Sequence, residues 1–322
     1  MTEHSATSSS SSQGSETDTG ILITGANGHL GQKLIPALAT ERRIVAVVRS
    51  KQAAKAVQAN VDALPAANAS KVSVAQLDYT DVDGLRKAST GCSEIIHLAG
   101  ILKESPWSTY QQAHEDTTQA LLKATADSPI KRIHYLSIVG SSPKASNACL
   151  ASKGRAEEML LDSPVPTLVL QVPMVLGEGD YAAAALNAQA RRGINFVFDV
   201  KARDQPLYAG DVVNALIGGS SLDATFNDRL TLAGPSAVNK RELITRAAGL
   251  VGNKTRVVGL PRGLAITMAR VFERVSKNPP VTEAMMDILH HDDNYDPDPA
   301  CEILKLRLTS LDDMLDHVLL RA

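Results

Sequence analysis

The fold is set by residues 20–31, which read Gly20-Ile21-Leu22-Ile23-Thr24-Gly25-Ala26-Asn27-Gly28-His29-Leu30-Gly31. Positions 21–24 are apolar or β-branched and predict a buried strand. Glycines follow at three-residue spacing, and leucines then recur at positions 30, 34 and 38, which is helical spacing. The segment therefore predicts a strand that runs through a glycine-rich turn into a helix.

This turn has the composition of a phosphate-binding site. Where side chains are missing, backbone N–H groups can approach a pyrophosphate at a helix N-terminus, and the helix dipole favours its negative charge. A glycine triplet alone is weak evidence, but its place between an apolar strand and an amphipathic helix is a stronger signal. We therefore predict a dinucleotide site that includes Gly25, Asn27, Gly28, His29, Leu30 and Gly31.

The composition limits what the chain can do. Its 322 residues are 44% hydrophobic with a formal net charge of -2, which fits a sizeable core plus a smaller second lobe. No basic patch indicates nucleic acid, and no apolar run reaches the roughly 20 residues that span a bilayer. Three cysteines without metal-ligand spacing indicate a reducing compartment and no metal site. Residues 1–18 contain a serine run and no secretory or mitochondrial leader, so we expect a disordered tail on a cytoplasmic protein.

A second strand, at residues 43–48, ends at Arg49. In a βαβ dinucleotide-binding unit, the end of this strand meets the adenosine ribose. An acidic residue there would bind the ribose 2′-hydroxyl, whereas an arginine suits a 2′-phosphate. Arg49 therefore favours NADP(H) over NAD(H). The alternative is a solvated arginine at a strand end.

Two further strand ends carry candidate cofactor contacts. A third strand leads to Asp78, which either accepts a hydrogen bond from an adenine amino group or caps the helix expected near Asp81. A fourth strand ends at Ala99 and Gly100, whose small size lets the backbone pass beneath a cofactor. His97, in that strand, is predicted to be a packed strand residue.

Strands and helices alternate along the first half of the chain. A long helix is expected at 107–127, a fifth strand at 131–137 and a sixth at 167–172. The alternation predicts an α/β fold, a doubly wound parallel sheet of the Rossmann type with helices on both faces. We expect residues 19–180 to form the NAD(P)-binding domain. Residues 181–322 are expected to form a smaller C-terminal lobe for a substrate or partner, partly interleaved with the sheet.

Three motifs carry a resemblance to a known superfamily. They are the turn at 25–31, the segment His97-Leu98-Ala99-Gly100, and Ser152-Lys153-Gly154-Arg155-Ala156-Glu157. Together they resemble the extended and atypical short-chain dehydrogenases/reductases, of the NAD(P)-dependent epimerase/dehydratase type. Residues 205–213 and 232–235 are similar to the branch that contains the NADPH-binding accessory subunit of respiratory complex I and its bacterial relatives.

The resemblance implies a catalytic tyrosine, a lysine four residues later that lowers the phenol pKa and holds the ribose, and a serine or threonine near the fifth strand. Lys153 fits the lysine, so it is a candidate for both catalysis and cofactor binding. Cys149, at the tyrosine position, and Ser137 are the other candidate catalytic residues. Ser137 matches the residue just before the family's serine, Ile138 falls at the serine position, and Ser141 or Ser142 could substitute for it. The Cys149 thiol either transfers a proton in place of a phenol, with a shorter reach, or is an inert small residue near the nicotinamide.

A basic amphipathic helix is predicted at residues 261–277 of the C-terminal lobe. Its apolar side chains follow one face and its arginines lie elsewhere, a pattern that suits a membrane surface, a partner groove or ordinary core packing. Besides NADPH, we therefore leave open a protein partner or a place at the inner face of a membrane.

Two functions are compatible with these residues. In the first, the chain binds NADP(H) in a structural or regulatory role, like the complex I accessory subunit, because the catalytic tyrosine is replaced. In the second, it is an NAD(P)H-dependent oxidoreductase, epimerase or dehydratase that acts on a small carbonyl or nucleotide-sugar substrate through altered catalytic residues. The sequence identifies neither a substrate nor an oligomeric state.

Overall fold

The larger lobe is built on one parallel sheet of seven strands, in the order β11-β6-β5-β4-β1-β2-β3. The computed structural model describes residues 20–261, 263, 267 and 292–321, so the expected tail at 1–18 and most of the expected helix at 261–277 lie outside it. The predicted doubly wound sheet is confirmed, because strand order reverses on either side of β1. The strands are β1 (Gly20–Thr24), β2 (Ile44–Val48), β3 (Val72–Gln76), β4 (Cys92–His97), β5 (Arg132–Ile138), β6 (Thr167–Val172) and β11 (Asp228–Thr231).

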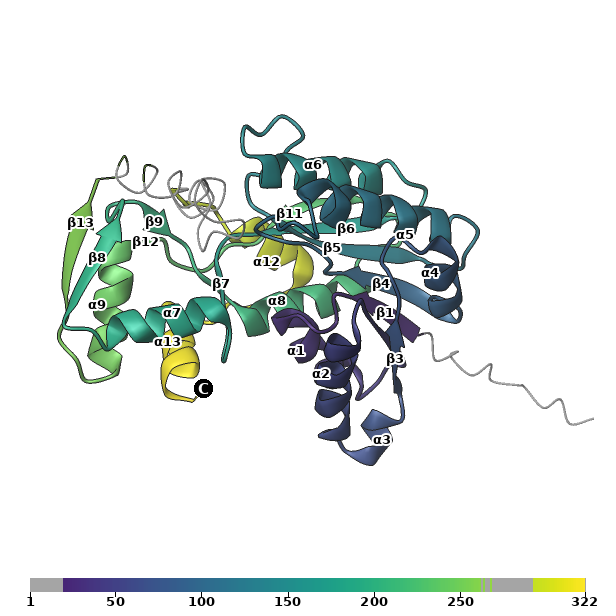
Figure 1. Ribbon diagram of the computed structural model, residues 1–322, viewed down its shortest axis with the longest axis horizontal. Coiled ribbons are helices and arrows are strands. Elements are labelled where there is room, and N and C mark those ends of the chain that lie inside the picture. The colour runs from purple at the N-terminus through teal and green to yellow at the C-terminus, as the bar shows by residue number, and fades with distance from the viewer. Residues whose placement is uncertain (1–19, 262, 264–266, 268–291, 322) are drawn as a thin grey trace, which may run out of the picture.

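Helices cover both faces of this sheet (Figure 1). Alternate residues of each strand point to opposite faces, so two separate apolar cores form, and the central strands are buried along their whole length. One core packs against α1 (His29–Leu38), α2 (Lys51–Asp62), α8 (Ala209–Gly218) and α12 (Asp298–Leu304). The other packs against α4 (Val82–Ala88), α5 (Thr117–Thr125) and α6 (Ala148–Leu161).

Side-chain caps begin several of these helices. Ser50 accepts a hydrogen bond from the third residue of α2, Asp81 does so for α4, and Asn147 accepts two backbone N–H groups at the start of α6. Helix α1 differs, because its N-cap is Gly28, which has no side chain to bond the first-turn N–H groups. The N-terminus of α1 is therefore suited to an external acceptor.

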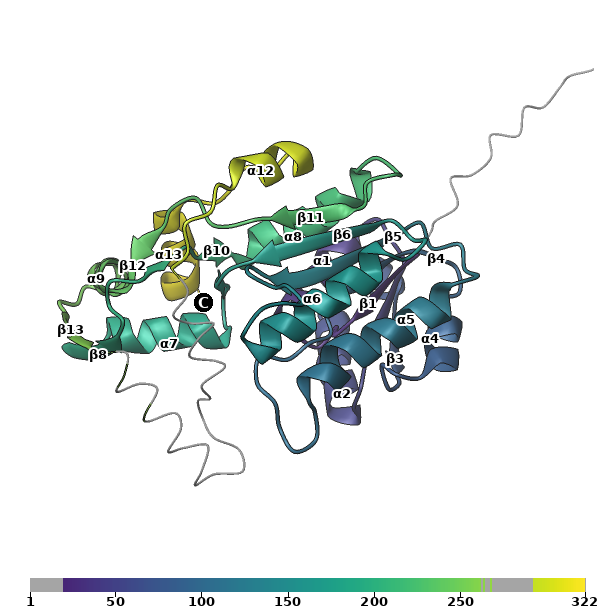
Figure 2. The same cartoon turned by 90° about the horizontal axis from the view of Figure 1, so that it is seen from above.

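The smaller lobe has its own core. It contains α7 (Tyr181–Ala190), α9 (Lys240–Leu250) and α13 (Leu311–Leu320), packed against a two-stranded parallel sheet of β8 (Ile194–Phe198) and β13 (Arg256–Leu260). Figure 2 shows this lobe beside the larger one, with α8 against the large sheet and β11 along its edge. The shorter elements are α3 (Ala66–Ala69), β7 (Val175–Leu176), β9 (Arg203–Asp204), β10 (Leu207–Tyr208), η2 (Gly219–Ser221) and β12 (Val238–Asn239).

The helix expected at 107–127 begins later than predicted. Trp107 lies in a loop and is 89% exposed, and the helical segment consists of the π-helix η1 (Gln111–Asp116) followed by α5. The reason is a local cap: the Thr109 N–H donates to the Gln112 side chain, and the Gln112 N–H donates to the Thr109 hydroxyl. This reciprocal pair starts the helix after position 109.

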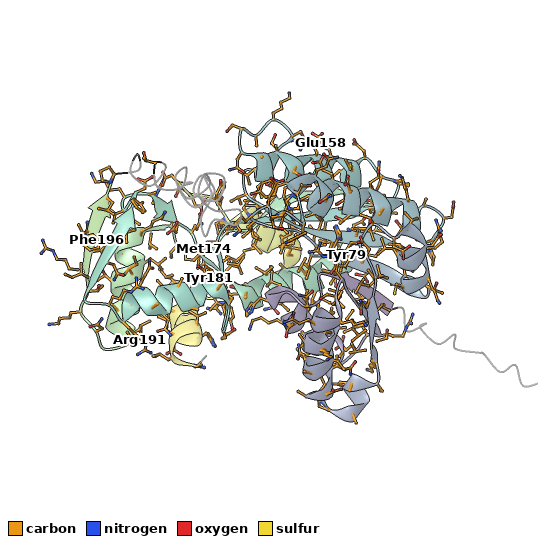
Figure 3. All side chains as sticks on the ribbon, viewed as in Figure 1. Tyr79, Glu158, Met174, Tyr181, Arg191 and Phe196 are labelled. Carbon is orange, nitrogen blue, oxygen red and sulfur yellow. The ribbon has the colours of Figure 1, made fainter. Side chains whose placement is uncertain are left out.

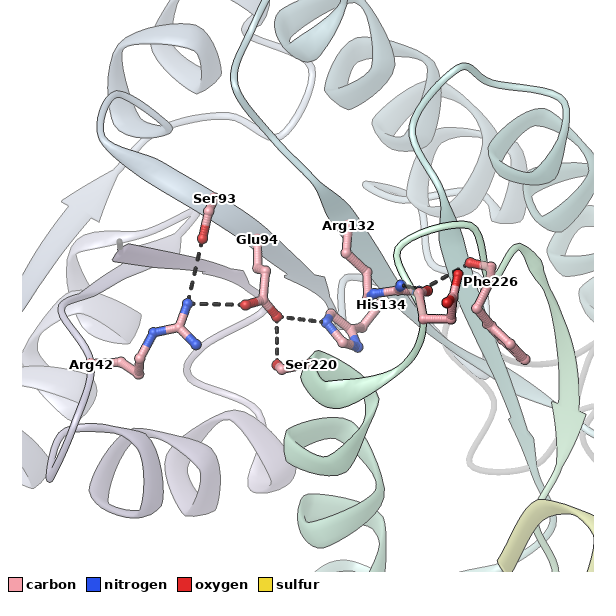
Figure 4. A network of polar contacts seen from close by, with 8 residues as sticks. Arg42, Ser93, Glu94, Arg132, His134, Ser220 and Phe226 are labelled. Atoms are coloured by element: carbon pink, nitrogen blue, oxygen red, sulfur yellow. Dashed lines mark hydrogen bonds and ion pairs between the residues drawn. The ribbon is translucent and has the colours of Figure 1, made fainter. Parts of the chain in front are cut away.

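A buried polar network fastens the end of α8 to the sheet (Figure 4). The Glu94 carboxylate in β4 lies 3.0 Å from Nε2 of His134 in β5, and it accepts hydrogen bonds from Ser220 at 2.5 Å and Arg42 at 3.0 Å. Burial alone raises the pKa of Glu94, but the contacts with His134, Ser220 and Arg42 outweigh it and lower the pKa to about 2. The carboxylate is therefore ionised and fully engaged at neutral pH.

Candidate cofactor site

The glycine-rich turn between β1 and α1 has the geometry that its sequence requires. Gly25 has a φ of +69°, in the left-handed region, and an added Cβ there would lie 3.0 Å from the Leu98 carbonyl carbon. At Gly31 an added Cβ would lie 2.7 Å from the Ala26 Cα, so α1 can pack this closely on the turn only with glycine. The strand, the turn and the helix therefore pack so closely that positions 25 and 31 leave no room for a side chain.

Two adjoining cavities open beside this turn. The smaller, about 170 Å³, is lined by the predicted residues Gly25, Asn27, Gly28, Ala99 and Gly100. The larger, about 500 Å³, lies beyond the end of β2 and β3. Because both share Arg49, Tyr79 and Thr117 as lining residues, they form one groove along the carboxyl edge of the sheet.

Arg49 and Asp78 both line the larger cavity, as their positions at strand ends implied. Asp78 does not cap α4, because that role belongs to Asp81, whose carboxylate accepts from the Gly84 N–H at 3.0 Å. Asp78 instead accepts hydrogen bonds from the backbone and hydroxyl of Thr80, which lower its pKa. Of the two interpretations of Asp78, the cap is excluded and the adenine contact stays a prediction.

Three of the predicted turn residues do not line either cavity. Leu30 packs against the core under α1, and Gly31 lies buried on the turn. The His29 ring faces the loop after β7, since an added Cβ at Gly177 would lie 2.7 Å from its Nε2. Burial lowers the pKa of His29. These residues shape the N-terminus of α1, and only their backbone is near the groove's glycines.

Tyr79 is a site residue that the sequence analysis missed. Its hydroxyl accepts a hydrogen bond from the Gly25 N–H at 2.8 Å and donates to the Val47 carbonyl at 3.1 Å, so it joins β1 to β2 at the turn. The Arg49 guanidinium lies 5.5 Å from the centre of its ring. Its place directly after Asp78, at the end of β3, was the available signal.

Lys153 lies behind Gly100, at the other end of the groove, and lines neither cavity itself. Its Nζ donates to the Leu136 carbonyl at 2.8 Å and lies 4.4 Å from the centre of the Tyr135 ring. Burial lowers the pKa of Lys153 to about 8. An added Cβ at Gly100 would lie 3.2 Å from this Nζ, so the glycine brings the amine directly under the backbone that lines the smaller cavity.

Cys149 lies one turn before Lys153 in α6 and is fully buried. Its Sγ points at the Ile101 carbonyl oxygen, 3.6 Å away, and Ile101 lines the smaller cavity. Burial raises the pKa of the Cys149 thiol to about 11, so the group is a protonated thiol at neutral pH. The structure thus brings Cys149 and Lys153 together next to the groove.

Ser137 occupies a different environment. It is buried in β5, and its hydroxyl donates to the Ser141 hydroxyl at 3.3 Å. Neither cavity is lined by it within the described residues. Its predicted catalytic role stays a prediction, and the structure offers it no contact with the groove.

Two buried histidines stand near Lys153. Nδ1 of His97 lies 2.7 Å from the Thr24 hydroxyl, and its ring stacks on Tyr135, so it is a packed strand residue as expected. Nε2 of His114 lies 3.1 Å from both the N and the O of Ile101. Burial, together with the nearby Lys153 amine, lowers the pKa of each histidine to about 3. Both are neutral at physiological pH.

The groove fits a nicotinamide dinucleotide. An uncapped helix N-terminus at Gly28 suits a pyrophosphate, and the groove extends from there past Arg49 on one side and toward Lys153 on the other. The missing side chain at Gly100 lets the Lys153 amine lie close to the backbone that lines the smaller cavity. A doubly wound sheet with a glycine-rich turn at its carboxyl edge is the arrangement of a Rossmann-type dinucleotide-binding domain.

Comparison with known proteins agrees with this class. Residues 21–167, slightly less than half of the chain, match the NAD dependent epimerase/dehydratase family. The expected resemblance to extended and atypical short-chain dehydrogenases/reductases is thereby confirmed. A curated relative, the ceramide reductase of Caulobacter vibrioides, is 23% identical over 242 residues, which cover 75% of this chain and 73% of the relative.

Solved structures share the fold along almost the whole chain. MoeE5 in complex with UDP-glucuronic acid and NAD has a TM-score of 0.69 at 20% identity, covering 93% of this chain and 97% of its own. The UDP-glucuronic acid 4-epimerase of Bacillus cereus in complex with NAD has a TM-score of 0.69 at 18% identity, covering 92% and 96%. Among the described residues, no helix combines the length and hydrophobicity needed to cross a bilayer.

Proposed function

We propose that the protein is an NADP(H)-dependent reductase that acts on a carbonyl group of a ceramide-type lipid. The observation that carries this proposal is the position of Lys153, whose amine lies against Gly100 in the wall of the cofactor groove. The similarity to a ceramide reductase over 75% of the chain supports the substrate class. The small carbonyl compound and the nucleotide sugar that the sequence also allows as substrates stay predictions.

The preference for NADP(H) rests on Arg49. Its guanidinium lines both cavities and stands over Tyr79, where a 2′-phosphate on the adenosine ribose would meet it. A hydrogen bond to a charged group contributes about 1.5–3 kcal/mol, or roughly 10- to 150-fold in affinity. Calorimetric titration should therefore show that Arg49→Asp weakens NADPH binding by at least about tenfold and NADH binding far less. Lys87→Asp, on the exposed side of α4, is the matched control, and an equal loss for both cofactors would exclude the phosphate contact.

The chain supplies a proton source without a phenol. The bound cofactor would supply hydride to the carbonyl carbon, and the oxygen then needs a proton from the protein. At neutral pH both the Cys149 thiol and the Lys153 ammonium carry one, since their pKa values are about 11 and about 8. The Lys153 amine loses its proton as the pH rises through about 8, so we expect reduction to slow above that pH.

The test is turnover of a ceramide-type lipid that carries a ketone, in detergent micelles with NADPH. We expect steady oxidation of NADPH, a decline in rate above pH about 8, and loss of turnover in Lys153→Met. Lys144→Met, an exposed lysine just before α6, is the matched control. Wild-type protein that binds NADPH but never oxidises it with such lipids would refute the reductase assignment.

A second candidate is an NADPH-binding accessory role without turnover, as in the complex I accessory subunit that the sequence resembles. The observation that favours it is Cys149, a fully buried thiol directed at a backbone carbonyl where the family has a phenol. This role predicts tight NADPH binding with the cofactor recovered in its reduced form. Replacement of Cys149 by serine would then change neither the affinity nor the redox state of the cofactor.

A further inference from the structure

The outer face of the β8 and β13 sheet is apolar and exposed. The strands pair in parallel with Ile194 opposite Arg256, Phe196 opposite Val258 and Phe198 opposite Leu260, which places these six side chains on one face. Ile194 is 55% exposed and Phe196 is 66% exposed. We call these six residues the β8·β13 face.

The other face of the same sheet is buried against the core of the smaller lobe. Val197 and Val257 are buried in the core formed with α7, α9 and α13, and Asn195 is buried with its side-chain N–H groups donating to Gln189 and Thr255. The strands are therefore firmly seated, so the exposure of Phe196 is not the fraying of a loose edge. No other part of the described chain packs on the outer face strongly enough to bury its aromatic and aliphatic side chains.

Positive charge gathers at the N-terminal ends of the two strands of this face, whereas Asp199 follows β8 at the other end. Arg191 and Arg192 follow α7, and Lys254 precedes β13, where Arg256 lies on the face itself; all four are exposed. Segments 181–198 and 243–260, which build this end of the lobe, contain no aspartate or glutamate. Figure 3 shows Phe196 at the outer end of the small lobe and Arg191 near the end of α7. An apolar surface with cations along one end complements an anionic lipid bilayer.

We propose that the β8·β13 face docks the protein on an anionic phospholipid membrane. The choice of a membrane over an acidic protein rests on the proposed function, because a lipid substrate has to be reached from a bilayer. In this arrangement, Ile194 and Phe196 enter the interface between headgroups and acyl chains while the neighbouring arginines and lysine contact phosphates. Such contacts hold a protein at the surface without a spanning helix.

The test is sedimentation of the full chain with vesicles of phosphatidylcholine containing about 30 mol% phosphatidylglycerol. We expect Ile194→Ser combined with Phe196→Ser to lower the partition coefficient at least tenfold. A factor of ten corresponds to about 1.4 kcal/mol of binding free energy, and full burial of either apolar side chain contributes more than that. Ile303→Ser combined with Leu320→Ser is the matched control, because these residues are 41% and 51% exposed elsewhere. The control pair should bind as wild type does.

A second pair of variants tests the charges. Arg192→Gln with Lys254→Gln should lower binding by about 25-fold, at about fivefold for each cation, and the effect should vanish at high salt or on pure phosphatidylcholine. Lys87→Gln with Lys144→Gln, both exposed on the large lobe, is the matched control. An equal loss in both charge pairs would overturn the proposal.

Two other results would also overturn it. One is vesicle binding that survives the Ile194 and Phe196 substitutions, and the other is a concentration-dependent dimer, seen by sedimentation velocity, that these substitutions abolish. The tests of membrane docking and of the proposed function are independent, because neither NADPH affinity nor turnover in micelles requires the β8·β13 face. Vesicle binding as described, with no turnover in micelles, would refute the reductase and retain the docking surface.

Discussion

Replacing Glu94 by glutamine should cost roughly 3 kcal/mol of stability at neutral pH. The network of Figure 4 lowers the pKa of this buried carboxyl from 4.5 to about 2, and each pH unit corresponds to about 1.4 kcal/mol. Glutamine keeps the size of the side chain but not its charge, so it removes the ion pair with Arg42. The expected loss comes from the electrostatic part of the network alone.

The pH dependence gives the prediction its sign. Because the pKa of Glu94 is lower in the folded chain than in the unfolded one, its contribution is complete above pH about 5 and is lost as the pH falls toward 2. Wild type should therefore lose stability between pH 5 and about 3 faster than Glu94→Gln does. The difference between the two proteins should shrink to about half near pH 3.

The assay is urea unfolding followed by far-ultraviolet circular dichroism at neutral and acidic pH. Circular dichroism is preferred because the single tryptophan, Trp107, is already 89% exposed in the folded chain and its fluorescence would change little. Glu158→Gln, at an exposed site on α6, is the matched control. A Glu94→Gln free energy of unfolding within about 0.5 kcal/mol of wild type, or a difference that does not vary with pH, would refute the reasoning.

Three further predictions concern other parts of the structure. Gly31→Ala should lower the free energy of unfolding by about 1–3 kcal/mol, because the added Cβ would lie 2.7 Å from backbone atoms. Gly249→Ala is the control: its added Cβ has no atom within 4 Å, so the change should be neutral or stabilising in the same urea assay. Lys33→Met should speed hydrogen exchange in residues 175–181 but not in β2, because it breaks the 2.5 Å ion pair that α1 makes with the loop after β7. Iodoacetamide at pH 8 should label the half-buried Cys301 well before the fully buried Cys149, and peptide mass spectrometry that finds the opposite order would contradict the burial of that thiol.

The sequence predicts the sheet well because its signals are local. Strands β1 and β2 are short apolar runs, Gly25 is required by its own φ of +69°, and Gly31 is required by its contact with Ala26 in the same turn. The candidate site residues Arg49, Asp78, Ala99 and Gly100 were placed by their positions at strand ends, and these ends meet because the strands are parallel.

Long-range pairing is what the sequence could not supply. Tyr79 became a site residue through a hydrogen bond to Gly25, 54 positions earlier, and nothing local marks that contact. The late start of the helix after Trp107 is a local exception, because it depends on a reciprocal cap between Thr109 and Gln112, three positions apart, whose residue types are each common in loops. The position of Cys149 against Ile101, in contrast, requires the loop after β4 to fold back over α6.

The chain returns to the large sheet through β11, and this limits where the protein can be cut into fragments that stay folded. β11 pairs with β6 along four residues, after residues 181–198 have already built part of the smaller lobe. A fragment that stops near residue 180 would therefore expose the edge of β6, a strand whose six residues are all buried in the full chain. Such a bare apolar edge recruits strands from other molecules, so the nucleotide-binding half should aggregate when expressed without its second half. The two lobes therefore depend on each other for solubility, although each has its own core.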